Sequence, residues 1–180
     1  RGASVTLIAG PVALTPPSGV ETVRVRSAQE MYDAVIPRSD AQDVIVMAAA
    51  VADYRPAEVA LGKIKKTHGE LTLRLVKNPD ILAELGARRA GRLPVLVGFA
   101  GETGDLVTYA REKLARKGGE LVVANLAADG FEGSDNLVTL VQADHAEALA
   151  RLSKHSVADR ILDTARQIWS SANAADRHGS

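Results

Sequence analysis

The sequence contains no cysteine and few aromatic residues, and both shortages limit what the protein can be. Without cysteine, disulfide bonds, thiolate metal sites and thiol nucleophiles are excluded. Aromatic residues make up only 3% of the 180 residues, whereas hydrophobic residues make up 46%. The core must therefore consist mainly of Ala, Val, Leu and Ile, which is typical of a buried parallel sheet covered by helices.

The sequence also lacks net charge, long apolar runs and a recognisable signal peptide. Its 22 basic and 22 acidic residues balance, so no general attraction to nucleic acid or to a membrane surface follows. No apolar run approaches the roughly 18 residues that a membrane-spanning helix needs. We therefore expect a cytoplasmic protein with neither nucleic acid nor membrane as a partner, in which any anion site is local.

Strand and helix patterns alternate along most of the chain. The predicted strands cover residues 5–9, 21–26, 43–50, 93–99, 120–124 and 136–142, and the predicted helices cover residues 27–36, 105–117 and 155–169, with another starting near Asn78. This alternation favours an α/β fold with an open, mostly parallel sheet and helices on both faces. Residues 43–50 are the most apolar and are expected to form the central strand.

The two ends of the chain carry different signals. Arg1-Gly2 leads at once into an apolar stretch. A glycine that ends a helix and is followed directly by a strand is typical of a βαβ unit. We therefore expect one N-terminally incomplete domain over residues 1–169. Residues 170–180 are small and polar and are predicted to form a disordered tail.

Residues 55–70 interrupt the alternation, because they are polar and rich in lysine. Residues 71–75 then alternate strictly, which predicts a half-exposed strand. We interpret this excursion as an extended β arm or flap. Its cluster Lys63-Ile64-Lys65-Lys66 could close over a triphosphate and offset charge that develops at the α-phosphate. A solvated loop is the alternative, and the cluster alone favours it.

Ligands of open parallel sheets bind beyond the carboxyl ends of the strands. One predicted strand ends in Ala48-Ala49-Ala50, where small side chains would let a base or a sugar approach the main chain, or would allow close helix–sheet packing. Asp53 follows, and it could bind a ribose hydroxyl or a cation, or cap a turn. By themselves these residues do not decide between ligand binding on the one hand and packing or turn capping on the other.

Lys113 and Lys117 are four residues apart and therefore share one face of a predicted helix. Two ammonium groups held together suit a polyphosphate. The alternative is a solvated helix end, where cations offset the helix macrodipole. By themselves the two lysines favour this alternative.

Three further positions are candidates for ligand contacts. The run Asn78-Pro79-Asp80 would place main-chain N–H groups at a helix start, although capping by Asn78 or Asp80 explains the same residues. Phe99 could stack on a base or pack in the core, and Asn125 could bind a ligand or cap a turn. The four histidines lack metal-ligand spacing, and the absence of a G-x-G-x-x-G run argues against an NAD-dependent oxidoreductase.

Taken in order, five segments resemble the bacterial phosphopantothenoylcysteine synthetase domain. They are Val46-Met47-Ala48-Ala49-Ala50-Val51-Ala52-Asp53-Tyr54-Arg55-Pro56, Lys63-Ile64-Lys65-Lys66, Lys77-Asn78-Pro79-Asp80-Ile81-Leu82, Gly98-Phe99-Ala100-Gly101-Glu102-Thr103 and Lys113-x-x-x-Lys117. The resemblance extends from Arg1 to about Trp169 and implies a Rossmann-like fold. That domain usually forms the C-terminal half of a bifunctional coenzyme A biosynthesis protein.

The resemblance implies a ligase that forms an amide (C–N) bond. In this family CTP activates the carboxylate of 4′-phosphopantothenate as an acyl-cytidylate, and the amine of cysteine then displaces CMP. The resemblance further implies Mg²⁺ bound through the triphosphate rather than by protein side chains. It also implies a homodimer with residues 71–75 near the partner, and a possible fusion to a phosphopantothenoylcysteine decarboxylase domain.

Carried over by motif, Lys63 would be the catalytic residue. The CTP-binding residues would be Met47, Ala48, Ala49, Asp53, Lys63, Pro79, Asp80, Ile81, Leu82, Phe99, Lys113 and Lys117. Ala49 and Asn125 are further candidates for binding the other substrate. The chemistry agrees with this assignment, because a carboxylate attacking an α-phosphate accumulates negative charge and needs nearby cations.

The sequence departs from the family pattern in two places. Family members usually begin with a strand, a Ser-Ser-Gly loop containing an Asn, and a helix, which bind the phosphopantothenate end. Because these are not found before residue 5, the alternative hypothesis is a non-catalytic nucleotide-binding or dimerisation fragment. Gly101 stands where the family commonly has Ala, which should loosen the turn beside Phe99.

Overall fold

The structure is a computed structural model that describes residues 2–65, 69–89, 91, 93–102, 104–126 and 135–178. The chain packs as two compact units. Unit 1 contains Arg1–Val35 and Ala49–Asp80, and unit 2 contains Ile36–Ala48 and Ile81–Ser180. This interleaving has no counterpart in the sequence patterns, which predicted one domain over residues 1–169.

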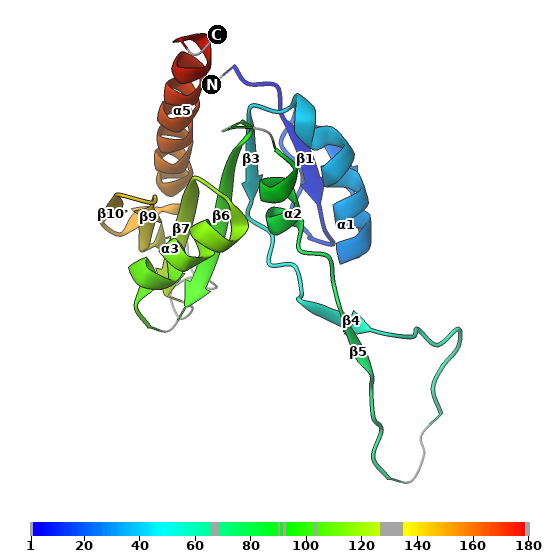
Figure 1. Cartoon of the computed structure of the whole chain (residues 1–180). Helices are drawn as coiled ribbons and strands as arrows, with labels where there is room; N and C mark the ends of the chain where they lie inside the picture. Colours follow the sequence, from blue (N-terminus) through cyan, green and yellow to red (C-terminus); the bar gives the residue numbers. More distant parts are fainter. Residues whose placement is uncertain are drawn as a thin grey trace. The chain divides into compact units, whose positions relative to one another are not determined.

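Unit 1 contains two small sheets and one helix. Strands β1 (Thr6–Ala9) and β2 (Glu21–Arg24) pair in parallel, and helix α1 (Ala28–Val35) follows them. Strands β4 (Tyr54–Pro56) and β5 (Leu75–Lys77) form an antiparallel pair. The chain between them forms an extended excursion (Figure 1). Residues 54–77 are called the arm below, and they confirm the predicted β arm.

Helix α1 begins as its sequence predicts. Ser27 Oγ accepts a hydrogen bond from the Glu30 N–H at 3.1 Å, while Glu30 Oε2 accepts one from the Arg26 N–H at 2.8 Å. These reciprocal bonds satisfy two N–H groups that a helix start leaves open, although the glutamate reaches one residue further back than in a standard capping box. After Val35 the chain continues as a 3-10 helix that contains Pro37.

Unit 2 is a mixed sheet flanked by helices. Its elements are η1 (Ile36–Ala41), β3 (Val44–Met47), α2 (Ile81–Arg88), β6 (Val95–Glu102), α3 (Leu106–Lys117), β7 (Leu121–Leu126), β8 (Asp135–Asn136), β9 (Val138–Val141), β10 (Ala146–Ala148), β11 (Leu152–Ser153) and α5 (Lys154–His178). Five strands form the main sheet in the order β10-β9-β7-β6-β3. Strands β3, β6 and β7 are parallel, whereas β9 and β10 are antiparallel additions, joined by a hairpin near His145.

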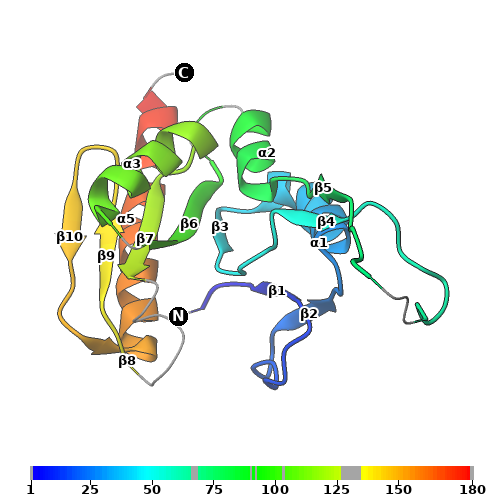
Figure 2. The ribbon, with the colours of Figure 1, turned by 90° about the horizontal axis from the view of Figure 1, so that it is seen from below.

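Helices cover both faces of this sheet, as predicted. In β7 the side chains of Leu121 and Val123 pack in a cluster with α5, and those of Val122 and Ala124 pack in another with α3. This alternation follows from the two-residue period of a strand. All four side chains are at most 1% exposed, so β7 lies at the centre of the core. Figure 1 shows α3 in front of β6 and β7, and Figure 2 shows the same sheet from below.

The prediction that residues 43–50 form the central strand is wrong. Strand β3 pairs with β6 and with no second strand among the described residues, and Val46 is 42% exposed. By contrast, Val95 to Val97 of β6 are fully buried, since β6 has a strand on each side and a helix on each face. An apolar run reports how buried the faces of a strand are, and it does not give the place of the strand in the sheet.

The prediction of a disordered tail from Ser170 is also wrong for the described residues. Helix α5 continues to His178, and Ala172 is 1% exposed. Alanine has the highest helix propensity, and no Gly or Pro interrupts the helix before Gly179. No helix among the described residues, including the 25-residue α5, is both long enough and apolar enough to cross a membrane.

A close approach between α2 and α3 leads to a first prediction. A Cβ atom on Gly86 of α2 would lie 2.0 Å from the main-chain oxygen of Lys117, at the end of α3. Replacing Gly86 by Ala must therefore separate the two helices, and we expect the free energy of unfolding to fall by about 1–3 kcal/mol. Urea unfolding followed by the fluorescence of Trp169, the only tryptophan, measures this in unit 2.

Gly104→Ala is the matched control, because an added Cβ atom there meets nothing within 4 Å. We expect its unfolding midpoint to stay within error of the parent chain. Equal stability of the Gly86→Ala variant and the parent would contradict the prediction, because it would show that the two helices can move apart with no fall in the free energy of unfolding.

Candidate active site

The ends of β3 and β6 and the start of α2 meet within unit 2. Met47, the last residue of β3, lies opposite Gly98 of β6. A Cβ atom on Gly98 would lie 2.8 Å from Leu82 Cδ2, so the Leu82 side chain rests directly on the glycine backbone. Three of the predicted nucleotide segments therefore come together here, and the missing side chain of Gly98 leaves the space that Leu82 occupies.

Lys113 reaches back from α3 to the same strand. Its Nζ donates a hydrogen bond to the main-chain oxygen of Phe99 at 2.6 Å. The ammonium group is thus held against the carboxyl half of β6, where ligands of parallel sheets bind. The Phe99 side chain packs against the α5 cluster, so core packing accounts for it in this structure.

Lys117 lies differently from Lys113, although both share one helix face. It is the last residue of α3, four residues or about 6 Å further along the axis. Gly118 follows in the left-handed conformation, with a φ of 65°, and closes the helix through its N–H to the Leu114 oxygen at 2.8 Å. The Lys117 main chain therefore lies toward the amino-terminal end of β7, whereas the Lys113 ammonium is bonded to the ligand side of β6.

Asn125 and Gly101 face each other across β6 and β7. A Cβ atom on Gly101 would lie 3.8 Å from Asn125 Oδ1, an ordinary contact, so alanine would fit. Gly101 lies within strand β6, and the expectation that it loosens a turn beside Phe99 is therefore wrong. The Asn125 Nδ2 donates to the Leu126 oxygen at 3.3 Å, which is a long bond.

Ala48 and Ala49 follow β3, and the boundary between the two units falls between them. Ala48 ends the first segment of unit 2, whereas Ala49 opens the second segment of unit 1. Both are exposed, which does not fit the alternative of close helix–sheet packing. Ile81 begins α2 and is 4% exposed, so its side chain is buried and does not face a ligand.

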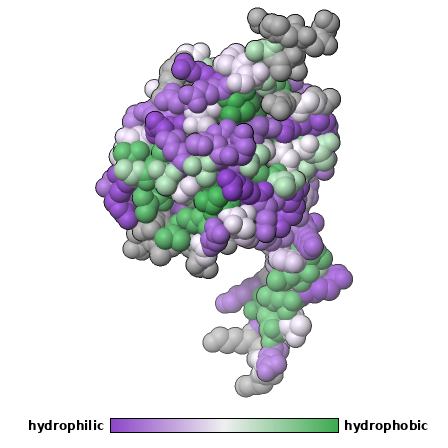
Figure 3. All heavy atoms as spheres, turned by 60° about the vertical axis from the view of Figure 1, so that its left-hand side comes forward, coloured by the Kyte–Doolittle hydropathy of each residue, from purple (hydrophilic) through white to green (hydrophobic). Residues whose placement is uncertain are grey.

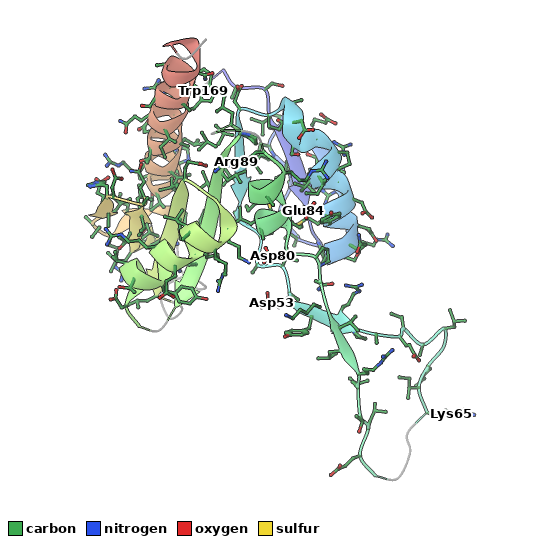
Figure 4. The ribbon with its side chains drawn as sticks, viewed as in Figure 1. Asp53, Lys65, Asp80, Glu84, Arg89 and Trp169 are labelled. Carbon is green, nitrogen blue, oxygen red and sulfur yellow. The ribbon has the colours of Figure 1, made fainter. Side chains whose placement is uncertain are left out.

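Within unit 1, Asn78 ties the residues before α2 to the loop that contains Asp53. The Asn78 N–H donates to the Asp53 main-chain oxygen at 2.8 Å. Helix α2 begins only at Ile81, so Pro79 precedes the helix by two residues instead of occupying its first turn. Figure 4 shows Asp53 and Asp80 close to each other at the base of the arm.

Lys63 lies on the arm, and its side chain is exposed. Figure 4 shows Lys65 far from the base of the arm, where Asp53 lies. Lys66 and His68 lie outside the described residues. Of the strand predicted over residues 71–75, only Leu75 belongs to β5.

Helix α3 begins at a capping aspartate beside the predicted site. Asp105 Oδ2 accepts a hydrogen bond from the Thr108 hydroxyl at 2.7 Å, and Oδ1 accepts one from the Thr108 N–H at 3.2 Å. These two bonds favour the ionised form and lower the pKa of Asp105. The start of α3 thus carries a fixed negative charge, which offsets the positive end of its dipole.

The predicted residues thus form two groups and one outlier. In unit 2, Met47, Leu82, Phe99, Lys113 and Asn125 gather around the carboxyl half of β6 and β7. In unit 1, Asp53, Pro79 and Asp80 lie around the base of the arm, and Lys63 lies further out on it. Within the described parts of the chain, no group of three or more His, Asp or Glu side chains could hold a metal ion.

Comparison with known proteins gives this arrangement a family. The family described as DNA/pantothenate metabolism flavoprotein C-terminal domain matches residues 1–168. The chain belongs to this family. Among its relatives, the coenzyme A biosynthesis bifunctional protein CoaBC of Vibrio parahaemolyticus is 46% identical over 172 residues, which are 93% of this chain and 43% of that protein. CoaBC of Mycobacterium tuberculosis is 49% identical over 176 residues, which are 91% of this chain and 42% of that protein.

Solved structures with the same fold are known. The crystal structure of the C-terminal domain of CoaBC is similar with a TM-score of 0.79 and 37% identity, over 94% of this chain and 76% of that one. A Cab2 mutant in complex with phosphopantothenate-cysteine is similar in fold alone, with a TM-score of 0.71 and 18% identity, over 88% of this chain and 55% of that one. The family's α/β fold is therefore confirmed for this chain, which spans less than half the length of its curated relatives.

The structure also assigns a position to two residues that the sequence did not single out for a role. Arg55 lies in β4 and bonds to the chain just before α2. Arg89 lies after α2 and bonds to the chain between α3 and β7. The partners of Arg55 are 22 and 23 residues away, and the Gly118 oxygen is 29 residues from Arg89, so no local pattern could have indicated these contacts.

Proposed function

We propose that this chain carries the phosphopantothenate–cysteine ligase activity of coenzyme A biosynthesis, with CTP as the activating nucleotide. The observation that carries the proposal is the family match over residues 1–168, combined with Lys113 held at the carboxyl half of β6. Coenzyme A biosynthesis is the process named for relatives that are 46% and 49% identical. A phosphopantothenate-cysteine complex is known for a protein of the same fold.

The first step of the proposed reaction joins two anions. A carboxylate oxygen of 4′-phosphopantothenate attacks the α-phosphorus of CTP, the bond from that phosphorus to the pyrophosphate oxygen breaks, and an acyl-cytidylate forms. Lys113 offers positive charge to the triphosphate from α3, and the exposed residues Ala48 and Ala49 are open to the base and sugar. Lys63 offers a further cation from the arm, for charge that develops at the α-phosphate.

The second step forms the amide. The amine of cysteine attacks the acyl carbon, CMP leaves with the electron pair of the carbon–oxygen bond, and the nitrogen releases a proton. In this proposal Asn125, beside Gly101, would donate a hydrogen bond to the acyl group. We also propose fusion to a decarboxylase domain, because the relatives are named as bifunctional and are more than twice as long as the matched part.

Mg²⁺ would accompany the triphosphate in this proposal. The ion prefers oxygen ligands and commonly binds through substrate phosphates together with one or two carboxylates. The chain offers the exposed carboxylate of Asp53, and such a sparse donor set fits an ion that arrives with its nucleotide. When bound, Mg²⁺ would neutralise charge on the phosphate oxygens.

We further propose a homodimer in which the arm lies against the partner subunit. The arm exposes large apolar side chains along its length, which Figure 3 shows as a hydrophobic stretch. These side chains are Tyr54, Val59, Leu61, Ile64, Leu71, Leu73 and Leu75. Exposed apolar surface of this extent marks an interaction site in a protein that must remain dispersed in water.

Replacing Leu71 and Leu73 together by Asp should convert a dimer to a monomer, because the charges cannot be buried without partners. Sedimentation velocity measures the change. Leu14→Asp is the control, since Leu14 is 79% exposed in unit 1 but lies outside the arm. A dimer that persists unchanged in the double variant would place the interface elsewhere.

A CTP titration tests the nucleotide site directly. We expect saturable binding that weakens at least about tenfold in Lys113→Ala, the effect of losing a charge-assisted contact. Arg116→Ala removes the same charge from an exposed position on α3 and should bind CTP like the parent. Equal affinities of both variants would remove Lys113 from the site.

A further inference from the structure

Asn78 has two neighbours that its sequence context does not predict. The run Asn78-Pro79-Asp80 predicts a helix cap, but the Asn78 side chain bonds elsewhere. Its Nδ2 donates to the Ala52 main-chain oxygen at 2.7 Å, and its main-chain N–H donates to the Asp53 oxygen at 2.8 Å. One residue thus binds two consecutive carbonyl groups of the loop after Ala49, 26 residues away.

Arg55 completes the arrangement from β4. Its Nη1 donates to the Lys77 main-chain oxygen at 2.8 Å and to Asn78 Oδ1 at 3.0 Å. The amide nitrogen of Asn78 therefore has an acceptor, the Ala52 oxygen, and its amide oxygen has a donor, the Arg55 guanidinium. A rotated amide would face the Ala52 oxygen with its own oxygen and the guanidinium with its own N–H₂ group. Its orientation is thus fixed by two independent contacts.

We propose that Asn78 and Arg55 act together as positioning residues, a latch that holds the Ala49–Asp53 loop against the segment before α2. The inference rests on the proposed function, which places Ala49, Asp53 and Pro79 in the nucleotide site. These residues lie on two segments of the chain that are joined by the latch, by the short β4–β5 pair and by a bond from the Ala57 N–H to the Arg74 oxygen at 2.9 Å. The same contacts close the base of the arm. The latch therefore also sets the direction in which the arm, which carries Lys63, extends from its base.

The latch is distinct from an anion site formed by Arg55 itself. An exposed arginine near a triphosphate would act by its charge, and its contribution would be independent of Asn78. A latch acts through geometry, so removing either residue releases the same loop. The two accounts differ in whether the effects of the two substitutions add.

The test is a double-mutant cycle on CTP affinity with the whole chain. Asn78→Ala is expected to weaken CTP binding about tenfold, the effect of one to two lost hydrogen bonds. Arg55→Ala should weaken it by a similar factor, and the double variant should bind no more weakly than the worse single variant. Arg74→Ala is the control, because Arg74 is a cation of the same arm with a side chain 77% exposed; its affinity should equal that of the parent.

Fully additive losses would overturn the latch, as would parent-like affinity in Asn78→Ala. Failure of the parent chain to bind CTP would instead refute the proposed function, and hydrogen exchange of the unliganded chain then decides on the latch alone. The main-chain amide at position 78 should exchange at least about tenfold faster in Asn78→Ala than in Arg74→Ala, since its hydrogen bond to the Asp53 oxygen is kept only while the loop is held in place. Unchanged exchange would overturn the proposal.

Discussion

Lys63→Ala lowers turnover by about a hundredfold to a thousandfold, the effect of removing one preorganised charge from a phosphoryl transition state. The loss should appear mainly in kcat, and the KM for CTP should change much less. The reason is that the negative charge Lys63 meets develops fully only as the carboxylate attacks the α-phosphorus. Pyrophosphate release with CTP and 4′-phosphopantothenate as substrates measures both constants.

The control for Lys63 is Arg74→Ala on the same arm. Arg74 lies 3.9 Å from Glu58 at a highly exposed surface, so its charge is already screened and should not influence turnover. Both variants should retain the circular dichroism of the parent, because neither side chain is buried. Parent-like turnover in Lys63→Ala would remove that lysine from the mechanism and leave the arm with an assembly role only.

Glu120→Ala should lower the free energy of unfolding by about 3–5 kcal/mol, as expected when one partner of a buried ion pair is removed. Arg89 Nη2 contacts both Glu120 Oε1 and the Gly118 oxygen, and the two side chains are only 11% and 16% exposed. Glu120 Oε2 also accepts the Leu96 N–H at 2.9 Å, and Arg89 Nη1 donates to the Pro94 oxygen at 3.0 Å. The pair therefore joins the end of α2 to the starts of β6 and β7.

Urea unfolding followed by Trp169 fluorescence measures this loss, because Trp169 belongs to the same unit and donates to Asp43 Oδ1 at 3.0 Å. Glu84→Ala is the control. It breaks an ion pair with Arg88 on the exposed face of α2, at 3.8 Å, and such pairs contribute about 0.3–0.5 kcal/mol. Similar losses in the two variants would mean that solvent screens the Arg89–Glu120 pair.

Much of the site was predictable because its residues lie in short motifs at the ends of strong strand patterns. Met47 and Phe99 follow apolar runs, so the parallel fold had to bring them to one side of the sheet. Lys113 was placed correctly on an amphipathic helix, but its bond to the Phe99 oxygen depends on how α3 crosses β6. That crossing is set by packing of small side chains such as Ala100 and Ala110, which no local pattern encodes.

The predictions that failed were those in which tertiary contacts outweigh local character. Residues 43–50 read as the central strand because they are apolar, yet the place of β3 is decided by pairing. The segment from Ser170 reads as a polar tail, yet its alanines extend α5 and bury Ala172. Asn78 reads as a cap because Asn before Pro and Asp is typical of a helix start, and its true partners lie 23 and 26 residues away.

The measurement that tests the central proposal most directly is pyrophosphate release from this chain, without cysteine. We expect release only when CTP and 4′-phosphopantothenate are both present, since the carboxylate is the nucleophile that expels pyrophosphate. The amount of pyrophosphate should approach one equivalent per site, because the acyl-cytidylate is not consumed when the amine of cysteine is absent. Saturable CTP binding without any release of pyrophosphate would contradict the ligase proposal and make this chain a nucleotide-binding fragment.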